Sequence, residues 1–166
     1  MAKTYGRLQE WRQKAIQEIV ESLTELGQEA CRYAIQQREY NNQLYNLRDS
    51  IGSAVYVDGQ IVPSSKRYAH SKSSRGPYKD KGWDGNGKYI TGREALDRYW
   101  DENQTLAYSK NTVELVVIAA TFYAGILESR GVQVISAAAD YLEDEMDTYK
   151  GYSPKLRGYA GHIDVI

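Results

Sequence analysis

The residues of this chain that could do chemistry are few and scattered. Its two histidines, His70 and His162, lie in polar segments, and neither has carboxylates or cysteines nearby at the spacing of a metal site. The single cysteine, Cys31, stands among apolar residues at helical spacing, which excludes an internal disulfide and predicts a small buried hydrophobic residue. The sequence therefore predicts no catalytic residues, no bound metal and no cofactor.

Two further segments imitate binding sites without meeting their requirements. Residues 82–87, Gly-Trp-Asp-Gly-Asn-Gly, are rich in glycine like a phosphate-binding loop, but no Lys-Ser or Lys-Thr pair follows them. Acidic residues at helical spacing follow one another near the end of the chain: Asp140, Glu143, Asp144, Glu145 and Asp147. We interpret them as one solvated or partner-facing helix surface rather than a cation site.

A long amphipathic helix is predicted over residues 7–38. Apolar residues recur there at steps of three and four, with polar and charged residues between them. The apolar positions are Leu8, Trp11, Ala15, Ile19, Leu23, Leu26, Ala30 and Ala34. Gly27 is expected to bend the helix or divide it, and residues 44–52 are expected to form a short helix or turn.

The remaining pattern is that of a small sheet with helices. Residues 53–57 and 60–62 flank Asp58-Gly59, the pair preferred in a type I′ hairpin turn, and Pro63 ends the second strand. Residues 112–120 form a nearly continuous apolar strand, which predicts a central strand covered on both faces. Helices are expected over residues 94–103 and 134–149, and an extended tail over residues 150–166. We therefore predict one α+β domain, residues 1–166, in which two helices pack on one face of an antiparallel sheet.

A long basic loop is predicted between the hairpin and the central strand. Residues 64–92 contain seven basic and two acidic residues and almost no aliphatic ones, so we expect them to become ordered only in an assembly. The aromatic residues among the charges could stack on nucleic-acid bases, or the loop could be an arm lying on a neighbouring subunit. For the second alternative, the predicted interface residues are Lys66, Arg67, Tyr68, Arg75, Tyr78, Trp83, Asp140, Glu143 and Asp144.

Composition places the chain in an ordinary class of globular protein. It has 166 residues and a formal net charge of −1, so no bulk electrostatic partner is implied. No apolar run predicts a membrane span or a signal peptide, and we expect synthesis in a cytoplasm. The chain has 15 tyrosines but only one phenylalanine, a bias that suits surfaces covered by partners.

Three segments together resemble the tail-completion, or head–tail joining, proteins of long-tailed bacteriophages related to the lambdoid group. The first is the long amphipathic helix. The second is an Asn-Leu-Arg-x-Ser-Ile element, here Asn46, Leu47, Arg48, Ser50 and Ile51. The third is a strand leading into a Tyr-Ala-x-x-x-Glu-x-x-Gly-like turn, here Tyr123, Ala124, Glu128 and Gly131. This chain departs from the family pattern before the Asn-Leu element and has a long insertion between the hairpin and the central strand.

The resemblance implies a structural protein without catalytic activity. It implies a homo-oligomeric ring, six-fold or twelve-fold, at the junction of capsid and tail in the virion. The neighbours would be connector proteins on the portal side and tail-tube proteins, with no membrane involved. The basic loop and the acidic helix are opposite in sign, which suits a head-to-tail contact that closes into a ring. A nucleic-acid-binding module that uses residues 64–92 is the alternative function.

Overall fold

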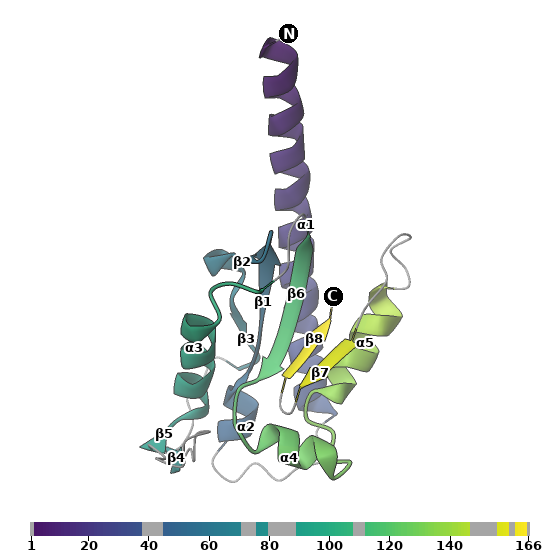
Figure 1. Cartoon of the computed structure of the whole chain (residues 1–166). Helices are drawn as coiled ribbons and strands as arrows, with labels where there is room; N and C mark the ends of the chain where they lie inside the picture. The colour runs from purple at the N-terminus through teal and green to yellow at the C-terminus, as the bar shows by residue number, and fades with distance from the viewer. Residues whose placement is uncertain are drawn as a thin grey trace.

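The computed structural model describes residues 2–37, 45–70, 76–79, 89–107, 112–146, 156–159 and 162–165. The chain has an α+β fold: an antiparallel sheet packs against a long N-terminal helix and a helix near the C-terminus (Figure 1). The described helices are α1 (Ala2–Gln36), α2 (Asn46–Asp49), α3 (Gly92–Glu102), α4 (Ala124–Ser129) and α5 (Ser136–Met146), with a 3₁₀ turn η1 (Pro63–Ser65).

The main sheet has the strand order β2-β1-β6-β8-β7, with β3 also paired to β1. Its strands are β1 (Ile51–Val57), β2 (Gln60–Ile61), β3 (Arg67–Tyr68), β6 (Val113–Ala119), β7 (Leu156–Tyr159) and β8 (His162–Val165). The predicted hairpin is confirmed: Asp58 and Gly59 both have positive φ, 51° and 76°, as a type I′ turn requires. The central position of β6 is also confirmed, because it pairs with β1 on one side and β8 on the other.

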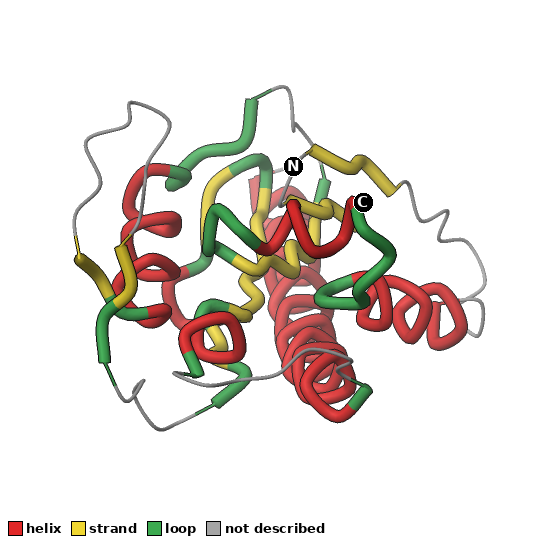
Figure 2. The backbone as a smooth tube through the Cα atoms, turned by 90° about the horizontal axis from the view of Figure 1, so that it is seen from below, coloured by secondary structure: helices red, strands yellow, loops and turns green. Residues whose placement is uncertain are grey.

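The predicted packing of the N-terminal and C-terminal helices on one face of this sheet is confirmed, and α3 covers the other face. Alternate residues of β1 and β6 point to opposite sides. Leu115 and Val117 join a core with α1 and α5, while Val116 and Ile118 pack with Leu96 and Trp100 of α3. Figure 2 shows the strands between α3 on one side and α1 and α5 on the other. The helix predicted over residues 94–103 is α3, but the sequence did not indicate which face of the sheet it covers.

The predicted long loop and extended tail both contain strands. Within residues 64–92, β3 pairs with β1, and β4 (Tyr78–Lys79) pairs with β5 (Tyr89–Ile90). The expectation that this segment has no structure of its own is therefore wrong for its described parts, while residues 71–75 and 80–88 lie outside the described residues. In the tail, β7 and β8 form a hairpin that extends the main sheet beside β6.

Helix α1 runs without interruption past Gly27, contrary to the expected bend. A Cβ atom on Gly27 would lie 2.7 Å from both Leu115 Cδ1 and Ser53 Oγ, so the glycine allows the helix to approach the sheet closely. The N-terminal half of α1 extends well beyond the sheet, away from the other elements (Figure 1).

Candidate assembly surfaces

The Asn-Leu-Arg-x-Ser-Ile element forms a joint between α2, α3 and the main sheet. The buried amide of Asn46 donates to the carbonyl of Gly76 at 2.9 Å and accepts from the backbone N–H of Gly92 at 2.8 Å. A Cβ atom on Gly92 would lie only 1.9 Å from the carbonyl oxygen of Asn46, so only glycine fits at the start of α3. Asn46 thus fixes where α3 begins.

The other residues of this element also make contacts within the chain. Leu47 and Ile51 belong to the core shared with α1. Arg48 forms an ion pair with Asp49 at 2.8 Å, and the Asp49 side chain is fully buried. The Ser50 hydroxyl donates to the carbonyl of Leu47 at 2.7 Å. The side chains of this element therefore stabilise the fold rather than form a reactive site.

The Tyr-Ala-x-x-x-Glu-x-x-Gly segment forms α4 and then caps α5. One carboxylate oxygen of Glu128 accepts hydrogen bonds from three successive backbone N–H groups, those of Val134, Ile135 and Ser136. The bonds to Val134 and Ser136 are both 2.9 Å long. A negative charge at this place satisfies the free amides and complements the dipole of α5. Gly131, between the two helices, has φ 78°, which a side chain would disfavour.

An aromatic cluster lies where α4 meets residues 76–79. The ring of Tyr78 stacks on Phe122 with centroids 6.3 Å apart and meets Tyr123 edge-on at 5.3 Å. Burial raises the pKa of Tyr123 to about 12, and a hydrogen bond with Thr121 opposes this shift. Phe122 is partly exposed, so the cluster has an open side.

The predicted basic interface is only partly gathered in one place. The ring of Tyr68 is covered by the guanidinium of Arg93, 3.5 Å from the ring centroid, and its hydroxyl donates to Asp97 at 2.6 Å. Burial, followed by the hydrogen bond to Asp97, raises the pKa of Tyr68. Arg67 donates to the backbone carbonyls of Ser64 and Lys66.

The contacts of Tyr68 with Arg93 and Asp97 bind β3 to α3 of its own chain. Lys66 is half-buried beside Arg67. The predicted interface residues Arg75 and Trp83 lie outside the described residues.

The predicted acidic interface lies on the exposed face of α5. Asp140, Glu143 and Asp144 are all exposed, as the helical spacing predicted. On the side toward α1, the Tyr141 ring stacks on Tyr33 with centroids 5.1 Å apart, and its hydroxyl donates to Glu29 at 3.1 Å. The acidic face and the basic residues of β3 therefore belong to different elements of the chain, with no described contact between them.

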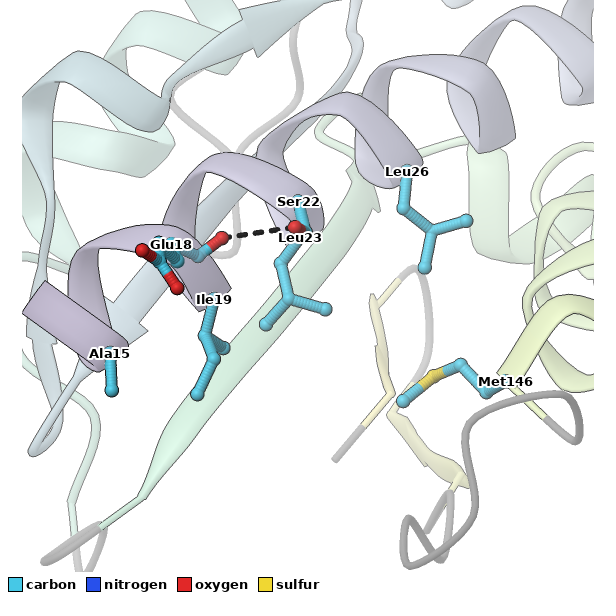
Figure 3. Close-up of a pocket in the computed structure, with 7 residues that line it drawn as sticks. All are labelled: Ala15, Glu18, Ile19, Ser22, Leu23, Leu26 and Met146. Atoms are coloured by element: carbon cyan, nitrogen blue, oxygen red, sulfur yellow. Dashed lines mark hydrogen bonds between the residues drawn. The ribbon is translucent and has the colours of Figure 1, made fainter.

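A groove beside α1 was not predicted. Figure 3 shows Ala15, Ile19, Leu23 and Leu26 along one side of α1, with Met146 at the end of α5 facing them. The groove has a volume of about 370 Å³, and Glu18 and Ser22 complete its lining. Trp11, one turn before Ala15 on the same side of α1, is 75% exposed. The sequence feature that indicates this groove is the apolar stripe of α1, which is longer than the part of the helix that a small sheet can cover.

The cysteine is buried as predicted, and the two histidines lie in different segments of the chain. Cys31 is fully buried, and burial raises the pKa of its thiol to about 12, with the Ser53 hydroxyl acting in the opposite direction. His70 is half-buried just after β3, and the backbone of His162 lies in β8. Among the described residues, His, Cys, Asp and Glu side chains form no group that could hold a metal ion.

Comparison with known proteins gives no relative of this chain. In the described part of the chain, no helix is both long enough and apolar enough to cross a membrane. No protein-family model, no curated protein and no solved structure matches this chain.

Proposed function

We propose that this chain is a structural, non-catalytic subunit of a ring at the head–tail junction of a long-tailed bacteriophage. The observation that carries the proposal is the N-terminal half of α1, which extends away from the sheet with Trp11 75% exposed. An apolar side chain of this size gains most when a partner covers it. The resemblance to tail-completion proteins supplies the setting, and the virion is the proposed location.

The two resembling motifs support a structural role through what they do in the fold. Asn46 positions the start of α3, and Glu128 caps α5. Both elements lie on the outside of the sheet, one on each face. A subunit that contacts different neighbours on different sides needs these outer helices held in fixed positions, and the motifs supply that rigidity.

The state of assembly provides the test. Light scattering after size exclusion, at several protein concentrations, should give a discrete oligomer, and negative-stain images should show closed rings. Reversing the charge of Lys66 and Arg75 to Glu should weaken assembly, because these residues were predicted to meet the acidic face of a neighbour. Arg32→Glu is a matched control, since Arg32 is exposed on α1. A chain that stays monomeric at every concentration contradicts the proposal.

Nucleic-acid binding through residues 64–92 is the competing outcome of the same experiments. The structure offers it little support at Tyr68, whose ring face and hydroxyl both have partners within the chain. A mobility-shift assay with DNA at increasing salt concentration separates the two functions, because phosphate contacts weaken steeply with salt. Tight, salt-sensitive binding by a monomer would favour the nucleic-acid module.

A further inference from the structure

Helix α1 changes in both burial and charge along its length. Trp11 and Ala15 are exposed, whereas Leu23 and Leu26 pack into the core on the same side of the helix. Residues 7–15 contain three basic residues and one acidic residue, Arg7, Arg12, Lys14 and Glu10. Residues 16–31 contain no lysine or arginine but four glutamates: Glu18, Glu21, Glu25 and Glu29. The first part is therefore a basic helix with an exposed apolar side, and the second part is acidic.

The groove that follows Trp11 has an apolar floor between acidic walls. Ile19, Leu23 and Leu26 on α1 face Met146 on α5 across it. Glu18 lines the groove, and Glu25, two turns further along α1, is exposed on the same flank of the helix. On the α5 side, Glu143 is exposed three residues before Met146, on the same side of the helix. A ligand that fits this groove must combine an apolar side with positive charges on its flanks.

The segment around Trp11 has the chemistry that this groove requires. Trp11 and Ala15 supply the apolar side, and Arg7, Arg12 and Lys14 supply the positive flanks. The groove volume of about 370 Å³ is more than twice the roughly 150 Å³ of a cavity that admits a benzene molecule, so an indole side chain fits. An amphipathic helix in an apolar groove is a common mode of recognition.

We infer that the basic N-terminal half of α1 from a second copy of this chain docks in the groove, with Trp11 between Ile19, Leu23 and Met146. The occupant is another copy because charge and apolar side match there, and both halves of the contact are present in every copy. This inference rests on the proposed function, since it names the surfaces through which subunits of the ring would meet.

Substitution of Trp11 is the first test of this contact. Trp11→Ala should weaken self-association, measured by sedimentation, by about 30-fold or more, the loss expected for a buried tryptophan at the centre of an interface. Trp11→Phe should retain much of the affinity. Gln13→Ala is the matched control, because Gln13 is exposed on the opposite side of the same helix turn and should associate like the unaltered chain.

Charge exchange tests the match between the two halves. Changing Arg7, Arg12 and Lys14 together to Glu should abolish self-association, and so should changing Glu18 and Glu25 together to Lys. Mixing the two variants should restore association, because each then meets a surface of opposite charge. Failure of the mixture to associate, with both variants folded by circular dichroism, overturns the inference.

A crosslink locates the contact and separates the inference from the proposed function. In a Cys31→Ser background, Trp11→Cys chains mixed with Met146→Cys chains should form a disulfide between copies under mild oxidation. If the unaltered chain forms rings but this crosslink is absent and Trp11→Ala rings are intact, the inference fails and the proposed function stands. If the crosslink forms but assembly stops at two copies, the contact is real and the ring is wrong. A monomer throughout overturns both.

Discussion

The carboxylate of Glu128 should be one of the strongest single stabilising groups in the C-terminal part of the fold. It accepts three backbone hydrogen bonds at the start of α5, from Val134, Ile135 and Ser136. Val134 and Ile135 are buried, so their N–H groups have little access to water when the carboxylate is removed.

The magnitude follows from these contacts. Loss of an N-terminal cap costs about 0.5–2 kcal/mol, and loss of the charge at the helix dipole costs about 0.3–1 kcal/mol. Two buried amides left without acceptors add to both, so Glu128→Ala should lower the free energy of unfolding by about 3 kcal/mol. Glu128→Gln keeps an acceptor oxygen and loses the charge, and should cost about 1 kcal/mol. The Tm of the Glu128→Ala variant should fall by about 10 °C.

Urea denaturation followed by circular dichroism measures both variants. Glu143→Gln is the matched control, because Glu143 is an exposed glutamate on α5 and its change should stay within about 0.5 kcal/mol. If Glu128→Ala unfolds at the same urea concentration as the unaltered chain, α5 does not depend on this cap, and the interpretation of the motif glutamate is wrong.

Two further substitutions and one titration test the fold. Gly131→Val should destabilise the chain by about 1–2 kcal/mol because φ is 78° there, whereas Gly76→Ala, which has open space and no positive φ, should be neutral by thermal melting. Val117→Asp places a charge in the core between β6 and α1 and should cost about 3 kcal/mol or more; a soluble variant with an unchanged Tm would contradict the central position of β6.

The Cys31 thiol, with its pKa raised to about 12, should resist alkylation in the folded chain up to high pH and react at once in urea. Because the folded pKa lies above the ordinary value of 9.0, its contribution to stability is complete below about pH 9 and is lost as pH rises toward 12. Rapid alkylation of Cys31 in the folded chain at neutral pH would show that the thiol is not enclosed.

Local patterns predicted those elements whose determinants lie close together in the chain. The hairpin turn depends on Asp58 and Gly59 alone. The apolar run of β6 indicated burial on both faces. In each case a few neighbouring residues carry the whole physical reason.

The missed features depend on residues far apart in sequence. Gly27 was expected to interrupt α1 because the closeness of Ser53 and Leu115 cannot be read from its neighbours. The pairing of β8 with β6 joins segments separated by more than forty residues, and β3 pairs with β1 although it lies in a polar stretch. The groove at Met146 exists only because α5 ends beside α1.

The position of β8 has a consequence for how the chain matures on the ribosome. Strand β6 obtains its second neighbour from residues 162–165, which are translated after every helix in the described part of the chain. A nascent chain that has emerged only as far as α5 carries β6 with one unpaired backbone edge, a template for pairing with another chain. The C-terminal hairpin thus closes that edge late, and a chain truncated before β7 is expected to aggregate rather than to assemble.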